Sequence, residues 1–311
     1  FVRELTQRST ATPDSAATIT EYNVGGFPDQ IQADARGVVW CSDPTQNRLL
    51  EIDPQTGAVT PHSTSPWTQP DGMIVDPDGR VWTGLYTGGH GLGMFDRGTG
   101  TFTRIAPPTA SASMAIPSWH HSGSIYCTQH SPATLYEYQP STATWKPSIL
   151  LPGIWPVSGN YDSTTGDLFI MQWTSNSIAR IHNSAVAGNY PTPVLAGPAF
   201  SAAHNGKIWF SYWSSTQIGE FDIKTSTFVT HNMTISGAGG PIDVGQNGHV
   251  YLGTRSTGYI IDFDPVSGTS TNHPIPSSNG WQLKDGLTVA PDGSVWFTSS
   301  SLGRVMRMTL P

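Results

Sequence analysis

The stretch Asp76-Pro77-Asp78-Gly79-Arg80-Val81-Trp82 joins a tight turn to an apolar run, and the pattern of its last four residues recurs along the chain. The pattern is a glycine, any residue, an apolar residue and an aromatic residue. It ends at seven aromatic residues: Trp40, Trp82, Tyr126, Phe169, Trp209, Tyr251 and Trp296. Successive aromatic residues lie 42, 44, 43, 40, 42 and 45 positions apart, so the chain repeats a unit of about that length.

A second apolar residue follows each aromatic residue after 12 or 13 positions and ends another short apolar run. These second positions are Ile52, Phe95, Tyr138, Ile181, Phe221, Phe263 and Met308. The runs are short and rich in Val, Ile, Trp, Tyr and Thr, which are residues typical of β-strands. Asn-Gly and Pro-Asp-Gly turns separate the runs, and such turns form hairpins. Each repeat therefore predicts several short antiparallel strands.

Repeats of 40 to 45 residues with several strands each are typical of propeller blades. We predict an all-β protein, a seven-bladed β-propeller of four-stranded blades. The seventh repeat ends at Pro311 without an outermost strand, and residues 18–22 (Thr-Ile-Thr-Glu-Tyr) read as a spare one. We expect this N-terminal strand to complete the last blade, so that residues 18–311 form a single domain and residues 1–17 a loose arm.

The two cysteines test this assignment. Cys41 and Cys127 directly follow the aromatic residue of the first and third repeats. Equivalent points of two non-adjacent blades lie further apart than the roughly 7 Å between Cα atoms that a disulfide tolerates. We therefore expect two buried free thiols.

Composition excludes some classes of partner. The formal net charge is −7 and no basic run occurs, which argues against binding to nucleic acid. No stretch of about 18 apolar residues is present, so a membrane-spanning segment is not expected. A start at Phe1, few charged residues and the sequon Asn232-Met233-Thr234 favour a secreted glycoprotein, which we expect to be a monomer.

In a propeller, the loop from the second to the third strand of each blade (the b–c loop) lies on the same face as the connection from the fourth strand to the next blade (the d–a loop). Loops on a rigid scaffold carry function, so the site is expected on this face. The b–c loops of blades 2 to 6 repeat in position but not in sequence, which suits one asymmetric ligand. We predict substrate-binding residues among the side chains of this face: Gln129, Gln172, Trp173, Tyr212, Trp213, Arg255 and Lys284.

Three residues of the same face are candidates for acid–base chemistry. His90 lies in the glycine-flanked segment 88–91, where a backbone can approach a ligand closely. An imidazole near its ordinary pKa is a suitable base or acid, and His130 and Tyr86 are further candidates. The alternative for each histidine is a solvent-exposed loop residue without a catalytic role.

Three aspartates share one place at the start of the first strand of a blade: Asp29, Asp71 and Asp285. A hard cation such as Ca²⁺ takes several oxygen ligands, so Asp71 and Asp285 are candidate ligands in the central channel. The alternative is that each aspartate caps its own turn. Aromatic residues of the d–a loops either wedge between blades or serve as ligand platforms; they are Phe27, Trp67, Trp155, Phe200 and Trp281.

The repeats at residues 70–82 and 285–298 resemble those of the streptogramin (virginiamycin B) lyase-like propellers, over nearly the whole chain. That resemblance implies β-elimination with a histidine and a divalent cation. No acidic residue of blades 2 to 6 matches the glutamate of the streptogramin enzymes, which counts against the antibiotic as substrate. The extracellular character is similar to that of the fungal L-rhamnose-α-1,4-D-glucuronate lyases. This implies a polysaccharide lyase acting on an acidic plant-type glycan, with His90 as the matched histidine.

Two alternatives stay open. One is a streptogramin-type or lactone-opening lyase of the same propeller group. The other is a non-catalytic sugar-binding propeller. A propeller lectin tends to repeat its site in every blade, whereas these loops differ from blade to blade, so the sequence favours a single catalytic centre.

Overall fold

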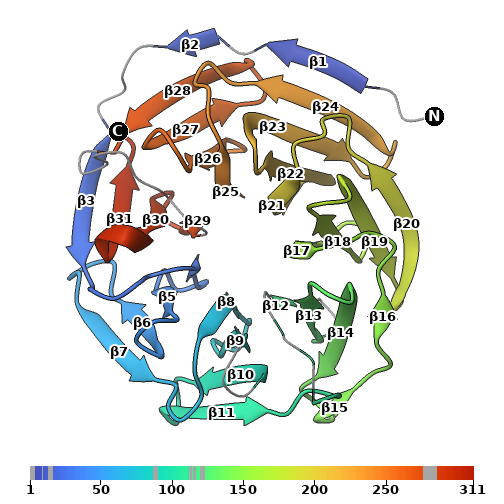
Figure 1. Ribbon diagram of the computed structural model, residues 1–311. Coiled ribbons are helices and arrows are strands. Elements are labelled where there is room, and N and C mark those ends of the chain that lie inside the picture. Colours follow the sequence, from blue (N-terminus) through green and yellow to red (C-terminus); the bar gives the residue numbers. More distant parts are fainter. Residues whose placement is uncertain are drawn as a thin grey trace.

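Seven antiparallel sheets surround a central axis in the computed structural model (Figure 1). The structure describes residues 4–8, 10–12, 17–86, 90–110, 112, 114, 117–119, 123–275 and 286–311. The only helix in these ranges is the short 3₁₀ helix η1 (Ser300–Leu302), and none is long and apolar enough to cross a membrane. The predicted seven-bladed propeller of four-stranded blades is confirmed.

The first four blades run in chain order from the innermost strand outward. Blade 1 contains β4 (Ile31–Ala33), β5 (Val39–Asp43), β6 (Arg48–Ile52) and β7 (Val59–Ser63). Blade 2 contains β8 (Pro70–Val75), β9 (Val81–Leu85), β10 (Gly91–Asp96) and β11 (Thr101–Ile105). Blade 3 contains β12 (Pro117–Trp119), β13 (Ile125–Gln129), β14 (Thr134–Gln139) and β15 (Thr144–Trp145), and β16 (Ile149–Leu150) also pairs with β14. Blade 4 contains β17 (Pro156–Asp162), β18 (Asp167–Gln172), β19 (Ser177–His182) and β20 (Ala185–Pro191).

The last three blades complete the ring. Blade 5 contains β21 (Pro198–His204), β22 (Lys207–Tyr212), β23 (Ser215–Asp222) and β24 (Thr227–Asn232). Blade 6 contains β25 (Gly239–Val244), β26 (Val250–Thr254), β27 (Tyr259–Asp264) and β28 (Thr269–Pro274). Blade 7 contains β29 (Leu287–Val289), β30 (Val295–Ser299), β31 (Arg304–Thr309) and, from the other end of the chain, β3 (Thr18–Asn23).

The glycine of each repeat adopts a left-handed backbone conformation. All seven repeat glycines have φ between 73° and 85°, in the left-handed region that glycine adopts without a steric penalty. In blade 2, the Asp76 carboxylate accepts hydrogen bonds from the Arg80 backbone N–H (2.9 Å) and the Trp82 indole N–H (2.8 Å). The turn and the aromatic residue of the repeat are thereby joined. The recurring pattern therefore indicates a hairpin turn, and the aromatic residue that follows the turn packs in the protein.

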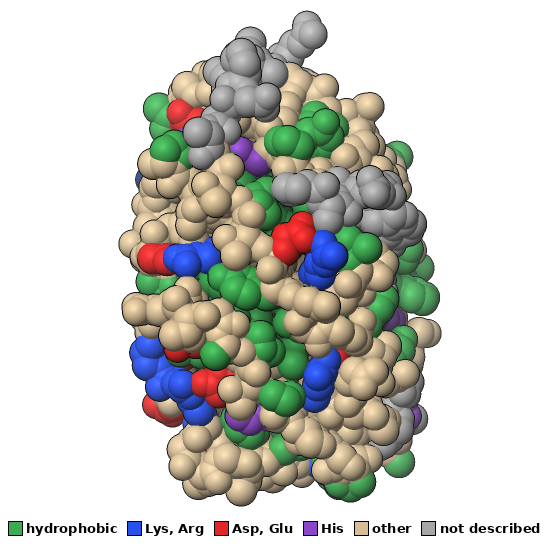
Figure 2. Space-filling view, turned by 90° about the vertical axis from the view of Figure 1, so that its left-hand side faces the viewer, with side chains coloured by type: hydrophobic (Ala, Val, Ile, Leu, Met, Phe, Trp, Pro, Cys, Tyr) green, Lys and Arg blue, Asp and Glu red, His purple; other side chains and the backbone are tan. Residues whose placement is uncertain are grey.

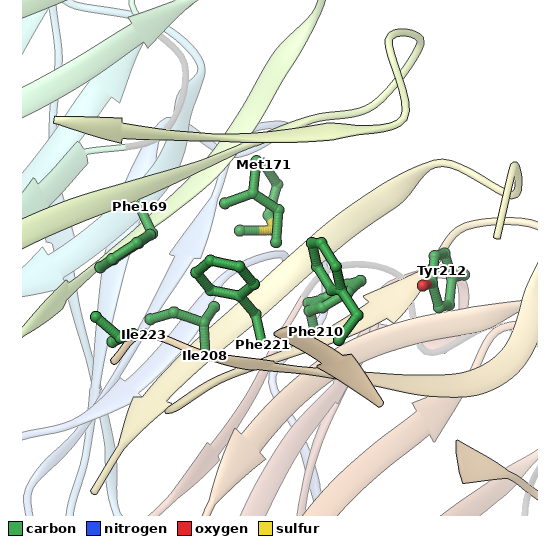
Figure 3. Packing of buried hydrophobic residues seen from close by; sticks show 9 residues of the cluster. Phe169, Met171, Ile208, Phe210, Tyr212, Phe221 and Ile223 are labelled. Atoms are coloured by element: carbon green, nitrogen blue, oxygen red, sulfur yellow. The ribbon is translucent and has the colours of Figure 1, made fainter. Parts of the chain in front are cut away.

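Aromatic and aliphatic side chains fill the space between neighbouring blades. Figure 3 shows Phe169 and Met171 of blade 4 packed with Ile208, Phe210 and Phe221 of blade 5. Similar apolar clusters lie at the other junctions. Each blade thus buries one face against the next.

The cysteines belong to these clusters. Cys41 and Cys127 are buried free thiols, as predicted. Burial raises the pKa of each thiol well above its ordinary value. Both side chains are therefore neutral apolar packing groups.

The ring is closed by pairing between the two ends of the chain. Strand β3 pairs antiparallel with β31, from Thr18 opposite Thr309 to Asn23 opposite Arg304, which confirms the predicted closure. The ring of Tyr22 stacks on Trp296 with a centroid distance of 5.5 Å, and Glu21 forms an ion pair with Arg304.

Two short strands of the N-terminal arm lie within the described residues, and the loose arm that the composition predicts stays a prediction. Strand β1 (Glu4–Arg8) pairs parallel with β24, and β2 (Thr10–Thr12) pairs parallel with β28. The arm therefore runs along the outer edges of blades 5 and 6 (Figure 1). The unpaired N–H and C=O groups of an edge strand explain how a short polar segment can dock there.

Charged side chains lie mostly at the outer surface and in pairs. Figure 2 shows blue and red side chains in neighbouring groups on one side of the ring, without a large patch of a single sign. Ion pairs of the described residues include Arg307–Asp292 (2.6 Å) and Arg80–Asp76 (2.6 Å), the second with a buried carboxylate.

Blades 1 and 5 share a His–Glu–aromatic cluster of the same composition, which is buried in blade 5 and half-buried in blade 1. In blade 5, His231 contacts the Glu220 carboxylate (2.9 Å) and lies between the rings of Trp209 and Phe263, the latter from blade 6. In blade 1, the same arrangement involves Glu51, His62, Trp40 and Phe95. Burial alone would raise the pKa of Glu220, but hydrogen bonds from His231 and Lys207 hold it below the ordinary value.

We predict that Tyr22→Ala lowers the free energy of unfolding by about 2 kcal/mol, because a half-buried aromatic ring that holds the closing strand is lost. Urea denaturation measures the change. Thr18→Ala, at an exposed position of the same strand, is the control and should change stability by less than about 0.5 kcal/mol. Equal effects of the two substitutions would contradict a special role of the Tyr22–Trp296 stack.

We further predict that Glu220 stabilises the folded protein at neutral pH and that this stabilisation is lost in acid. Because its pKa is lower in the folded protein than in the unfolded chain, its stabilisation is complete above about pH 4.5 and is lost as the pH falls through the folded-state pKa. Glu220→Gln should therefore flatten the dependence of melting temperature on pH below 4.5. An unchanged slope in the variant would refute this assignment.

Candidate functional site

One register position carries a ring or a guanidinium in five successive blades. It lies four residues after the aromatic residue of the repeat, where the second strand of each blade ends. In blades 2 to 6 this position holds Tyr86, His130, Trp173, Trp213 and Arg255. Blades 1 and 7 carry Pro44 and Ser300 there. The side chains that can stack on a ligand are thus confined to one arc of the ring.

The rings of this arc contact one another in sequence. Tyr86 and His130 have ring centroids 6.0 Å apart, and those of Trp173 and Trp213 are 5.2 Å apart. The Arg255 guanidinium carbon lies 3.3 Å from the centroid of the Trp213 ring, in cation–π geometry. We call these five residues, together with Trp155, the aromatic arc.

Trp155 joins the two halves of the aromatic arc. It lies in the d–a loop before β17, and its ring stacks on His130 with a centroid distance of 5.1 Å and an interplanar angle of 15°. Its other neighbour is Trp173, at 6.0 Å and nearly perpendicular. The sequence named Trp155 as either a wedge or a platform. In the structure the residue packs on two rings of the site and keeps 40% of its surface exposed.

His130 is the member of the aromatic arc with acid–base capacity. Both of its ring nitrogens are inaccessible to solvent and have no hydrogen-bond partner within the described ranges. Burial lowers the pKa of the imidazole below its ordinary value of 6.5. The side chain is therefore a neutral base at physiological pH, because the low-dielectric surroundings disfavour the charged form.

His90, the first candidate from sequence, belongs to the same loop as Tyr86. Its Nδ1 is buried without a hydrogen-bond partner among the described residues, and its carbonyl oxygen accepts a hydrogen bond from the Arg104 side chain (2.9 Å). Its φ is 37°, an uncommon value for a residue other than glycine. Residues 87–89 of the same loop lie outside the described ranges. The role predicted for His90 stays a prediction.

The two predicted glutamine ligands form hydrogen bonds within the protein, and their role in substrate binding stays a prediction. The Gln172 side chain is fully buried: its Oε1 accepts a hydrogen bond from Gly153 N (2.6 Å), and its amide nitrogen donates to Ser177 (3.0 Å) and Asn189 (2.7 Å). Gln129 contacts two carbonyl groups of its own loop and the Tyr136 hydroxyl. Tyr212 is fully buried in the cluster between blades 4 and 5. The three side chains face the protein interior because they belong to the second strand itself, whereas the next residue begins the loop.

The predicted channel metal is not tested. Asp285 and Lys284 lie outside the described residues, and Asp71 is half-buried at the start of β8. Within the described ranges, no group of three or more His, Cys, Asp and Glu side chains is arranged to hold a metal ion. Asp29, the third aspartate, is buried. The Ca²⁺ assignment therefore stays a prediction.

A cavity of about 150 Å³ lies along the central channel and is lined by innermost strands of the blades. Sequence reasoning missed Asp243 in its wall. Its carboxylate accepts hydrogen bonds from Val244 N and, across the blade junction, from Val289 N, both at 2.8 Å. Burial raises the pKa of Asp243 to about 6. In the sequence, Asp243 follows Pro241 and Ile242 on an inner strand, and this position was the available signal for a carboxylate in the channel wall. No turn motif marks the residue.

The predicted glycosylation site lies at the outer rim, away from the aromatic arc. Asn232 ends β24, and its side-chain Oδ1 accepts a hydrogen bond from the Gln217 side-chain amide (2.6 Å). Arg8 of β1 is paired opposite it. Whether the asparagine carries a glycan is not tested by these contacts.

Comparison with known proteins finds similarity in three dimensions only. A scan of protein-family models and a search of curated sequences give no match. Among solved structures, a streptogramin B lyase is similar, with a TM-score of 0.86 and 21% identity, covering 95% of this chain and 98% of that chain. The virginiamycin B lyase of Staphylococcus aureus gives a TM-score of 0.84 at 16% identity, covering 95% of this chain and all of that chain.

Two further solved structures have a similar architecture, one of the same lyase and one from outside these lyases. A catalytically inactive variant of the S. aureus enzyme, in which a histidine is replaced by alanine, was solved with quinupristin and has the same similarity. A chain of the mitotic checkpoint complex gives a TM-score of 0.77 at 13% identity. At these identities the comparisons establish the seven-bladed fold, and the chemistry has to be argued from the site.

We predict that substitutions at two adjacent residues affect different properties, stability at Gln172 and ligand binding at Trp173. Gln172→Leu leaves the buried Gly153 N–H unsatisfied and should lower the free energy of unfolding by about 1–3 kcal/mol. Trp173→Ala, at the start of the loop, should change stability less and ligand binding more. Urea denaturation and calorimetric titration with ligand separate the two effects. A stable Gln172→Leu variant with impaired binding would restore Gln172 to the ligand site.

Proposed function

We propose that this protein is a lyase that breaks a carbon–oxygen bond by β-elimination on the face of the aromatic arc, with His130 as the general base. The observation that carries the proposal is the neutral, water-shielded imidazole of His130, whose ring nitrogens have no partner within the described residues. A base in this state can accept a proton without first giving up a hydrogen bond.

The chemistry follows from these groups. Both ring nitrogens of His130 are covered in the free protein, so substrate binding has to displace a covering side chain; a ring nitrogen of His130 then removes the proton from a carbon adjacent to a carbonyl group. The electrons of that C–H bond form a carbon–carbon double bond, and the bond to the leaving oxygen breaks with its electron pair on the oxygen. That oxygen is then protonated by the imidazolium of His130 or by the Tyr86 hydroxyl, which belongs to the neighbouring ring. No step is assigned to a metal ion.

The aromatic arc defines the kind of substrate. Three indole rings and an imidazole offer flat apolar faces, and such faces stack on other rings and on the apolar faces of sugars. We therefore propose a ring-bearing substrate. The structural similarity to streptogramin B lyases makes a streptogramin-type cyclic ester at least as good a candidate as a glycan.

A second candidate is the acidic glycan predicted from sequence. One contact favours it: the Arg255 guanidinium stacks on Trp213 and provides a positive charge at one end of the aromatic arc. A uronate carboxylate is a natural partner for a guanidinium group. Secretion, glycosylation at Asn232 and a bound Ca²⁺ belong to the same proposal and await their own tests.

The test is to incubate the protein separately with quinupristin and with a rhamnosyl-glucuronate glycan, and to record ultraviolet absorbance and product masses. Elimination creates an absorbing double bond and leaves the mass of an opened cyclic ester unchanged, whereas hydrolysis adds one water. A product of hydrolytic mass, or binding of both compounds without turnover, would refute the lyase proposal.

We predict that His130→Gln lowers kcat/KM by about 10²- to 10⁴-fold, because the general base is lost. Since burial lowers the pKa of His130, the acidic limb of the wild-type kcat/KM profile should fall below pH 6.5. His90→Gln is the matched variant. Loss of activity in His90→Gln with full activity in His130→Gln would assign the base to His90 instead.

A further inference from the structure

Trp155 has a backbone conformation that tryptophan disfavours. Its φ is 58°, in the left-handed region. Pro156 follows it, and a proline further restricts the backbone conformation of the residue before it. The same place before the innermost strand is left-handed in blade 2, at Gln69 (φ 54°), and in blade 5, at Gly197 (φ 71°). Both of these residues also precede a proline. The connection itself therefore requires this conformation, and glycine meets the requirement most easily.

Blade 4 nevertheless places a large ring at this position. In blade 5, a side chain on Gly197 would collide with the Trp173 ring, because an added Cβ would lie 2.1 Å from it. In blade 4, the equivalent side chain instead reaches His130 and stacks on it in near-parallel geometry. Strained backbone persists where surrounding contacts compensate for it, and such places cluster at functional sites.

The contacts of Trp155 fix its ring from two directions. Its carbonyl oxygen accepts a hydrogen bond from Trp173 N (3.0 Å), and the Trp173 ring meets it nearly edge-on. The ring is thus held by the first residue of the blade 4 loop while its face covers His130. A covered imidazole face excludes water from one side of the base.

His130 has no hydrogen bond within the described residues to set its orientation. A catalytic imidazole is usually oriented by a hydrogen bond to its second nitrogen. Here the contacts that orient the ring are aromatic: Trp155 on one side and Tyr86, at 6.0 Å and tilted by 52°, as the other ring neighbour. Burial is the sole contribution to the lowered pKa of His130 that the described residues make, with no charged neighbour involved.

We infer that Trp155 is a positioning residue for His130, which orients the imidazole by stacking and shields it from water in place of a hydrogen-bonded partner. This inference rests on the proposed function for its catalytic meaning, but its physical content can be measured on the protein without substrate.

The experiment follows the imidazole of His130 by NMR titration, assigned with the His130→Gln variant. In the wild type, the pKa of His130 should lie below 6.5. Trp155→Gly removes the ring while keeping the left-handed backbone, and should raise that pKa toward 6.5. Trp155→Phe retains a stacking ring and should keep most of the downward shift. Gln69→Gly, at the equivalent place in blade 2, is the control for the backbone change and should leave the titration unchanged.

Steady-state kinetics provide the second readout, measured with whichever of quinupristin and the rhamnosyl-glucuronate glycan the wild-type protein transforms. Trp155→Gly should lower kcat by about 10²-fold, as expected when a reacting group is misplaced, with little change in KM. An unchanged titration in Trp155→Gly, or a raised KM with unchanged kcat, would overturn the inference and make Trp155 a scaffold or substrate platform. A shifted titration in a protein that transforms neither substrate would support the positioning contact while the lyase proposal fails.

Discussion

The structure depends on burial of each blade against its neighbours. A blade is apolar on both faces and cannot bury them alone, and clusters such as that of Phe169, Phe210 and Phe221 exist only where two blades meet. In a linear array the two terminal blades would each leave a face exposed. Pairing of β3 with β31 removes this difficulty, because it makes the first and last parts of the chain one sheet. The closing strand is therefore a condition for the packing of the whole ring.

A closed ring also fixes where side chains can converge. The second strand of every blade ends at an equivalent place, so the residue that follows it recurs at one register position around the ring. The aromatic arc arises because five successive blades carry a ring or a guanidinium at that position. Trp155 fills the gap between His130 and Trp173 from a different loop, which makes the arc continuous. The proposed base in blade 3 is thus contacted by a ring from blade 2 and by a ring from the connection to blade 4.

The fold could be predicted because its signals are local and repeated. A left-handed glycine, a hairpin turn and an aromatic residue at fixed spacing recur seven times, and the missing strand of the last repeat pointed to residues 18–22. The site could be predicted only in part. The loops named Trp173 and Trp213 as candidate ligands, and the structure brings their rings into contact, but the burial of Gln172 one residue earlier depends on where the strand ends and the loop begins. The stacking of Trp155 on His130 joins two blades, and the spacing along the chain does not encode the distance between them.

The shared register position of the aromatic arc has an evolutionary consequence. Because its members stand at equivalent places in successive repeats, a single substitution there alters the ligand surface while the packing residues four positions earlier remain untouched. Duplication or exchange of a whole blade would carry one such side chain with it and shift the recognition pattern around the axis by one step. The architecture thereby separates the residues that maintain the ring from those that can diversify its specificity, and a few changes at the mouth are enough to give one scaffold a new ligand.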